Sequence, residues 1–183
     1  FGDRAATLAW NGFRHLELYY AISGIGAVCH TINPRLSAEQ MVYIINHARD
    51  RLVFVDTDLV PIISAIVDQL DDDITYVILC EVNEMPEHDL RNALCYEALI
   101  QEETSEYIWR DLDEDSACSL CYTSGTTGNP KGVLYSHRST VLHAFSTSLA
   151  FPNVFQTGVK ILPVVPLFHV NAWGIPYTAP LVG

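Results

Sequence analysis

Basic residues are scarce in this sequence. Its 183 residues contain 10 Lys and Arg against 22 Asp and Glu, which gives a formal net charge of −12 at pH 7. Proteins that bind the phosphate backbone of nucleic acids need a positively charged face, so this composition argues against a nucleic-acid partner. A polyphosphate ligand would have to be held by local donors against a repulsive overall field. Lys131 is the outstanding candidate for that task.

Long hydrophobic runs are also missing. Every long apolar stretch is interrupted by Pro, Asn or a charged residue well short of the ~20 residues that span a bilayer. We therefore expect no transmembrane segment, and peripheral membrane contact is left open. The sequence starts at Phe1 and stops within the apolar residues 175–182, so we expect a chain that is truncated at both ends.

A paired cysteine framework is lacking as well. The cysteines are odd in number, scattered and mostly set in apolar segments: Cys29, Cys80, Cys95, Cys118 and Cys121. A free thiol in such a segment behaves as a small hydrophobe, which favours a reducing, cytoplasmic setting. Cys118 and Cys121 match C-x-x-C, but without a second pair or a ligand-spaced His this is a weak indication of a zinc or redox site.

The first half of the chain alternates between strand and helix patterns. A capping box at Ser37 and Gln40 predicts one helix, and an apolar stripe behind Asp58 predicts a second. The apolar runs that predict buried strands are residues 24–32, 52–55 and 75–80. Strands and helices that alternate over short connections are typical of a parallel sheet covered by helices. We therefore predict an α/β fold with a Rossmann-like layered sheet and flanking helices.

The second half begins with an acidic stretch, residues 81–115, which we interpret as solvated surface. Its acidic run at residues 111–115 is likewise interpreted as surface rather than as a cation site. Beyond it, a helix is predicted to open at Ser136 or Ser139. The apolar side chains that line this helix are Val141, Leu142, Phe145 and Leu149, and the predicted strands are residues 117–122, 132–135 and 159–165. The loop between the first two of these strands is the most informative segment of the chain.

This loop has the composition of a polyphosphate site. It carries four hydroxyl side chains, two glycines and one lysine: Thr123, Ser124, Thr126, Thr127, Gly125, Gly128 and Lys131. Glycines let backbone N–H groups approach an anion, hydroxyls add neutral donors, and the lysine supplies a positive charge. Mg²⁺ prefers oxygen ligands, and the hydroxyl of Thr123 at the strand end suits it.

Two other phosphate-binding motifs do not fit the loop. A Walker A loop requires G-x-x-x-x-G-K-[ST], but Pro130 and Gly132 flank Lys131 here. A dinucleotide fingerprint requires G-x-G-x-x-G at the start of a helix, whereas this loop runs into a predicted strand.

Two segments resemble one known family. Residues 122–132 (YTSGTTGNPKG) resemble the phosphate-loop signature of the adenylate-forming superfamily of acyl-CoA synthetases, adenylation domains and luciferases. Residues 165–174 (VPLFHVNAWG) resemble its downstream motif, in the version of medium- and long-chain fatty-acyl-CoA synthetases. Weaker similarity includes residues 33–36 and 135–138. The resemblance implies that residues 1–183 are part of the large N-terminal AMP-binding (adenylation) domain, with the C-terminal domain absent.

The resemblance also implies a reaction. An acid, in this version a fatty acid, would attack the α-phosphorus of ATP to give acyl-AMP and pyrophosphate, and coenzyme A would then displace AMP. Residues 123–131 would hold the ATP phosphates, and Thr123 would contact Mg²⁺. Lys131 and His169 would be catalytic, while His169, Val170 and Trp173 would face the acyl-adenylate, although a His between two apolar residues is by pattern alone more often a core histidine.

Alternatives remain open at this stage. The family's magnesium-binding glutamate, ribose-binding aspartate and C-terminal lysine lie outside these residues, so we expect the 183 residues alone to be inactive. The unfinished apolar end leaves homodimerisation open. A ligase for aryl or amino acids and a nucleotide-binding module without ligase activity are the competing hypotheses.

Overall fold

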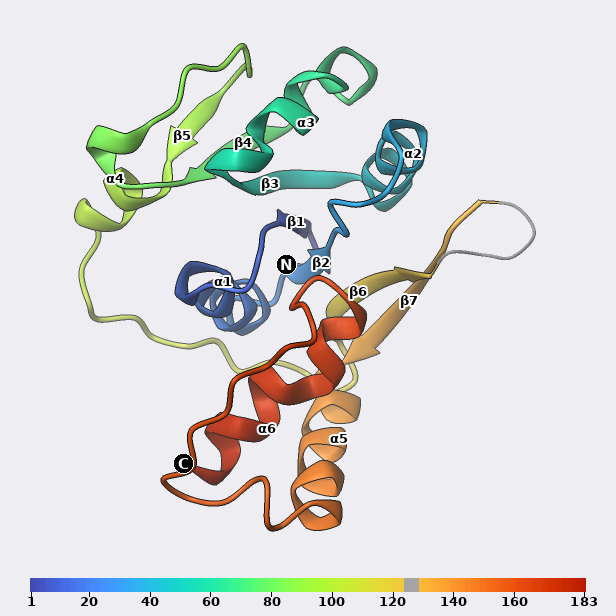
Figure 1. The fold of residues 1–183 in the computed structure, drawn as a ribbon, viewed down its shortest axis with the longest axis vertical. Coiled ribbons are helices and arrows are strands. Elements are labelled where there is room, and N and C mark those ends of the chain that lie inside the picture. Colours follow the sequence, from blue (N-terminus) through green and yellow to red (C-terminus); the bar gives the residue numbers. More distant parts are fainter. Residues whose placement is uncertain (124–128) are drawn as a thin grey trace.

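The computed structural model describes residues 1–123 and 129–183. In this part of the chain, seven strands form one sheet in the order β5-β4-β3-β1-β2-β6-β7 (Figure 1). The neighbours from β5 to β6 run parallel, and β7 pairs antiparallel with β6 at one edge. The predicted α/β fold with a layered sheet and flanking helices is confirmed.

The elements are short and closely spaced. The strands are β1 (Arg4–Leu8), β2 (Val28–Thr31), β3 (Asp50–Asp56), β4 (Thr75–Leu79), β5 (Ala93–Cys95), β6 (Ala117–Thr123) and β7 (Lys131–Ser136). The helices are α1 (Phe13–Gly24), α2 (Ala38–Ala48), α3 (Val60–Ser64), α4 (Tyr96–Gln101), α5 (His137–Ala150) and α6 (Ile175–Val182). Short 3-10 segments are Thr57–Leu59, Val67–Gln69 and Val82–Glu84, and a further tight turn lies at Val170–Gly174.

Helices cover both faces of the sheet (Figure 1). On one face, α2 and α3 bury side chains such as Ile45 and Ile63 against β1, β3 and β4. On the other face, Tyr19 and Ile22 of α1 pack with Cys29 of β2 and with Leu167. The central strands are therefore buried on both faces, as their continuous apolar runs require.

Helix α2 forms as its sequence predicts. The Ser37 side chain accepts from the Gln40 N–H, and the Gln40 side chain accepts from the Ser37 N–H. This capping box satisfies two backbone donors that the first turn would otherwise leave unpaired. Its apolar stripe is buried as predicted, namely Met41, Ile44, Ile45 and Ala48.

Three expected elements differ from the structure. The strand expected at residues 24–32 begins only at Val28, because the chain is still in α1 at Gly24 and turns at Gly26 with φ +82°. The helix expected behind Asp58 ends at Ser64 and gives way to a 3-10 segment. The strand expected at residues 159–165 is wrong, as described next.

Residues 159–165 pair with no strand in the described part of the chain. The carbonyls of Pro163 and Val165 instead accept from the Asn11 side-chain amide at 3.0 and 3.2 Å. Leu162 and Val164 point outward, with 86% and 88% of their surface exposed. An apolar run forms a strand only where a neighbouring strand can pair with its backbone N–H and C=O groups.

Helix α5 is capped by Ser136, one of the two predicted starting residues. The Ser136 side chain accepts from the Ser139 N–H at 3.1 Å and caps the helix. Its apolar stripe, however, faces outward, with each of Val141, Leu142, Phe145 and Leu149 at least half exposed. The inward face uses Ala144, and α5 packs beside α6 (Figure 1).

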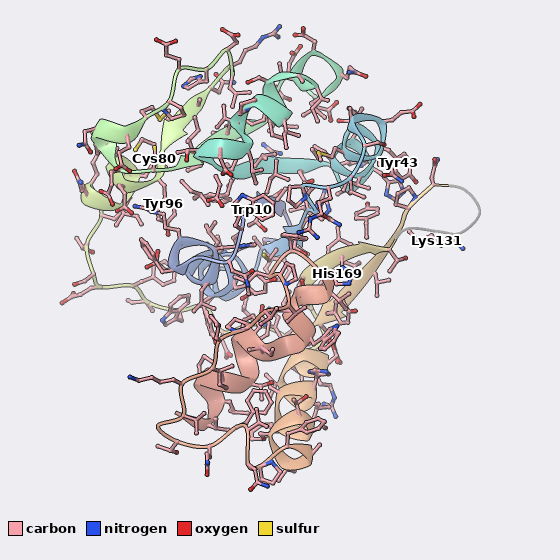
Figure 2. All side chains as sticks on the ribbon, in the orientation of Figure 1. Trp10, Tyr43, Cys80, Tyr96, Lys131 and His169 are labelled. Carbon is pink, nitrogen blue, oxygen red and sulfur yellow. The ribbon has the colours of Figure 1, made fainter. Side chains whose placement is uncertain are left out.

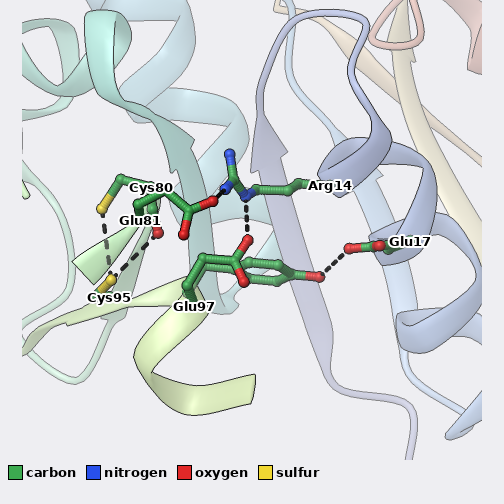
Figure 3. Close-up of polar contacts among 7 residues, drawn as sticks. Arg14, Glu17, Cys80, Glu81, Cys95 and Glu97 are labelled. Carbon is green, nitrogen blue, oxygen red and sulfur yellow. Dashed lines mark hydrogen bonds and ion pairs between the residues drawn. The ribbon is translucent and has the colours of Figure 1, made fainter. Parts of the chain in front are cut away.

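Ion pairs fasten α1 to the ends of β4 and β5 (Figure 3). The Arg14 guanidinium lies 2.6 Å from a carboxylate oxygen of both Glu81 and Glu97. Close by, the thiols of Cys80 and Cys95 lie 3.6 Å apart (Figure 3). All five cysteines are free, as the lack of a paired framework predicts.

Candidate functional site

Strands β6 and β7 hold the two ends of the predicted phosphate loop. Thr123 pairs directly with Lys131 in the sheet, and its hydroxyl donates to the Lys131 carbonyl at 3.4 Å. Both residues are exposed, and Figure 2 shows Lys131 at the base of the loop. The remaining predicted loop residues lie outside the described part of the chain: Ser124, Gly125, Thr126, Thr127 and Gly128. The loop follows the carboxyl end of β6, the edge where open α/β sheets bind ligands.

The strand end that leads into the loop rests on polar contacts. The Tyr122 hydroxyl lies 2.7 Å from His47 Nδ1 on α2, and its ring centroid lies 5.1 Å from that of His30. The buried His30 ring is held in turn by Asp50, at 2.7 Å. Burial raises the pKa of Tyr122 to about 12, so the phenol stays protonated near neutral pH. These contacts fix the position from which Thr123 projects.

A second segment, residues 165–174, crosses the same end of the sheet. The Asn11 side-chain oxygen accepts from the Leu167 N–H at 2.7 Å. The rings of Trp10, which follows β1, and Phe168 meet edge to face with centroids 5.8 Å apart. The segment is therefore fixed to the loop between β1 and α1.

The backbone of this segment contains a left-handed turn. Val170, Asn171, Ala172 and Trp173 have φ angles between 47° and 54°. A non-glycine residue in this conformation costs roughly 1–2 kcal/mol, because its Cβ crowds the following carbonyl oxygen. Four such residues in a row persist only where surrounding contacts hold them.

Asn171 supplies those contacts. Its side-chain oxygen accepts from the Thr31 hydroxyl at 3.2 Å and from the Cys121 thiol at 3.0 Å. Its amide nitrogen donates to the Ser119 hydroxyl at 3.0 Å. Burial raises the pKa of the Cys121 thiol, which therefore remains a protonated donor. The turn is thus attached to both β2 and β6.

These contacts bring the two signature segments together. Cys121 precedes Thr123 by two residues on β6, and Asn171 follows His169 by two residues. A strand rises ~3.3 Å per residue, so the contact with Asn171 lies about 7 Å along β6 from Thr123. Figure 2 shows His169 beside β6 and Lys131 farther out, where β7 begins. The structure therefore places the predicted phosphate and acyl segments at one end of β6.

An open cavity of about 430 Å³ lies beside the left-handed turn. Its wall includes Val170 and Trp173, together with Tyr135, Thr140, His143 and Tyr177. Trp173 is 64% exposed, and His169 is also exposed rather than a core histidine. Gly174 approaches α5 so closely that a Cβ there would lie 2.7 Å from His143 Nδ1. The cavity combines aromatic walls with a few polar groups, as small-molecule sites commonly do.

Some residues of this site were not predicted. Asn171 lies inside a recognised motif, but its partners on β2 and β6 are far away in sequence. His143 belongs to no motif, and its place on the cavity wall depends on how α5 packs.

A magnesium ion would find a suitable ligand in Thr123. Its hydroxyl is exposed at the strand end, and Mg²⁺ usually combines one or two protein oxygens with waters and phosphate oxygens. Among the described residues, no group of three or more His, Cys, Asp or Glu side chains could enclose a metal. Cys118 and Cys121 are buried and bonded to other side chains, which gives no support to a C-x-x-C metal site.

The chain is similar to known proteins in sequence and in fold. The AMP-binding enzyme family matches residues 1–183. A medium-chain-fatty-acid–CoA ligase of Ectopseudomonas oleovorans is 55% identical over 183 residues, covering 99% of this chain and 33% of the relative. A 3-methylmercaptopropionyl-CoA ligase of Ruegeria lacuscaerulensis is 52% identical, covering 99% and 34%. A crystal structure of a long-chain-fatty-acid-CoA ligase from Archaeoglobus fulgidus matches with a TM-score of 0.80 and 19% identity, covering 96% and 33%.

The chain therefore spans about a third of the length of the curated relatives it matches. Within the described residues, no helix is both long enough and apolar enough to cross a membrane.

Proposed function

The chain belongs to the AMP-binding enzyme family, and on that basis we propose that the full-length protein activates a carboxylic acid with ATP and transfers it to coenzyme A. The observation that carries this proposal is the meeting of the two signature segments at the carboxyl end of β6. One segment holds Thr123 and Lys131, and the other holds the exposed His169 together with Val170 and Trp173, which line a cavity.

The first step joins the acid to the nucleotide. A carboxylate oxygen attacks the α-phosphorus of ATP, the bond from that phosphorus to the bridging oxygen breaks, and pyrophosphate leaves. Such a step depends on aligning the reacting groups and balancing charge rather than on a strong base. The exposed Lys131 would pair with phosphate oxygens, and the residues between it and Thr123 would add hydrogen-bond donors.

Mg²⁺ would supply further charge neutralisation on the phosphates, with Thr123 as its protein ligand. The chain's net charge of −12 makes local cations more important, because the overall field repels polyphosphates.

The second step transfers the acyl group. The sulfur of coenzyme A attacks the acyl carbonyl carbon, its proton is lost, and AMP leaves with the carboxylate-derived bridging oxygen. His169 lies exposed in the segment that faces this end of the sheet and would contact the reacting acyl-adenylate. Val170 and Trp173 would contact the acid's apolar tail through the cavity they line.

A fatty acid is the substrate class we propose. The aromatic cavity wall supports an apolar tail, and the medium-chain relative is named for a fatty acid. The other relative, 52% identical, is named for 3-methylmercaptopropionate, a short thioether acid. The length of the tail therefore needs a direct measurement.

Acid-dependent ATP–pyrophosphate exchange on the full-length protein tests the proposal. The acids to compare are acetate, octanoate, palmitate, 3-methylmercaptopropionate, benzoate and a mixture of amino acids. Stimulation by octanoate or palmitate supports fatty-acid activation, whereas stimulation by benzoate or amino acids alone contradicts the substrate class. Bound ATP without exchange for any acid contradicts the ligase assignment and leaves a nucleotide-binding module.

A further inference from the structure

Asn171 lines the cavity together with Val170 and Trp173 but is much more buried than either. Asn171 is 8% exposed and its amide bonds to residues of the sheet, whereas Val170 and Trp173 are 40% and 64% exposed. All four residues from 170 to 173 share the left-handed backbone conformation. The left-handed backbone sets the direction in which Val170 and Trp173 project. Residues with a Cβ disfavour this conformation, so other contacts must hold it.

Three buried partners surround the Asn171 amide. Thr31, Ser119 and Cys121 are at most 6% exposed, and each is bonded to Asn171. Thr31 and Cys121 are neighbours in the pairing of β2 with β6, and Ser119 lies two residues earlier on the same face of β6. The amide uses both its donor and its acceptor atom here, which a methyl group or a hydrogen could not do.

We propose that Asn171 is a positioning residue, which holds the left-handed turn so that His169, Val170 and Trp173 are oriented toward the acid. This rests on the proposed function. Without the amide, Ser119, Thr31 and Cys121 lose a buried partner, and the turn loses the contacts that offset its strain. The backbone then relaxes toward the right-handed region, which moves the side chains on both sides of residue 171.

The test compares Asn171→Ala with Asn46→Ala in the full-length protein. Asn46, on α2, is a fitting control because its side-chain amide also holds a distant stretch of backbone. It donates to the Gln69 carbonyl at 2.9 Å. In acid-dependent exchange with the best acid, we expect Asn171→Ala to raise the KM for the acid about tenfold or more and to lower kcat. The KM for ATP should stay within about twofold, because the loop ends at Thr123 and Lys131 are held by sheet pairing.

A second-site change separates strain from general damage. Glycine adopts the left-handed conformation without steric cost, so Ala172→Gly should restore the acid KM of Asn171→Ala by about threefold or more. No recovery would overturn the proposal, as would a wild-type acid KM in Asn171→Ala. An equal rise in both KM values, with loss of protection throughout the sheet, would show a general structural role and also overturn it.

Hydrogen–deuterium exchange gives a readout that needs no substrate. The Ala172 N–H donates to the His169 carbonyl at 3.0 Å within the turn, while the Leu167 N–H is held by Asn11. We expect Asn171→Ala to speed exchange at Ala172 about tenfold and to leave Leu167 unchanged. The two proposals can therefore fail separately. Absence of ATP–pyrophosphate exchange with every acid would refute the proposed function. Unchanged hydrogen-exchange protection at Ala172 in Asn171→Ala would refute the positioning role.

Discussion

At the scale of single residues, charge makes Lys131 unusual. Lys160 is the only other lysine in the sequence, and acidic residues outnumber basic ones by 22 to 10. Lys131 opens β7 directly opposite Thr123, so its position is set by sheet pairing rather than by loop conformation. With its backbone held in this way, Lys131 needs to order only its flexible side chain to meet a phosphate.

Replacing Lys131 by Ala should reduce acid-dependent ATP–pyrophosphate exchange by about a hundredfold, the usual effect of losing one preorganised charge contact. Lys160→Ala is the matched control, because Lys160 is also exposed but lies outside the site. Equal rates in the Lys131 variant and the control would refute the role assigned to Lys131.

Trp173 offers the largest exposed apolar surface on the cavity wall. Trp173→Ala should raise the KM for octanoate about tenfold or more, since burying an apolar side chain of this kind contributes ~1.5–3 kcal/mol. Trp109→Ala serves as the control, because Trp109 is 60% exposed and lies in the connection before β6. A smaller effect on acetate than on octanoate would agree with contact to the tail, and identical effects on both acids would contradict it.

At the scale of elements, those that depend on local sequence signals were predictable, and those that depend on long-range contacts were not. Helix α2 follows from Ser37 and its apolar stripe, because both signals lie within one short segment. Strand β1 (RAATL) was missed because Ala is a poor strand former and its burial comes from both neighbours, β2 and β3. Residues 159–165 have a strand's composition, but the Asn11 side-chain amide donates to their carbonyls in place of a neighbouring strand.

The site residues also divide into those that local sequence predicts and those that long-range contacts determine. Thr123 and Lys131 were predicted from a contiguous motif, and the pairing of β6 with β7 places them together. Asn171 could not be predicted, because its role depends on three residues from two strands and on a left-handed backbone.

Helix α1 carries a buried histidine with a consequence for stability. His15 donates from Nδ1 to the Trp10 carbonyl at 2.9 Å, and Nε2 accepts from the Thr7 hydroxyl at 3.0 Å. Burial lowers the pKa of His15 to about 4, below its usual value of 6.5. Protons therefore bind the unfolded state more tightly, and the contribution of His15 to stability is lost as pH falls from about 6.5 to about 4.

The difference between wild type and His15→Gln isolates this effect from other titrating groups. Urea denaturation should show the stability advantage of wild type shrinking by up to about 3 kcal/mol between pH 7 and pH 4. A His15→Gln difference that is constant with pH would contradict the assignment.

At the scale of the whole molecule, the sheet brings residues from distant parts of the chain to one edge. Trp10 after β1, Thr123 on β6 and Phe168 after α5 all lie at or beyond the carboxyl ends of parallel strands. The parallel order of β1, β2 and β6 thus makes this edge the meeting point of both signatures. The central claim is that a carboxylate and ATP react there to form an acyl-adenylate.

The most direct test follows the oxygen atoms of the acid. Full-length protein is incubated with ATP, coenzyme A, Mg²⁺ and octanoate, or the acid most active in exchange, carrying ¹⁸O in both carboxylate positions. The products are then analysed by mass spectrometry. An acyl-adenylate predicts that AMP leaves with one ¹⁸O, while pyrophosphate carries none. Formation of ADP, or of acyl-CoA with unlabelled AMP, would contradict the account.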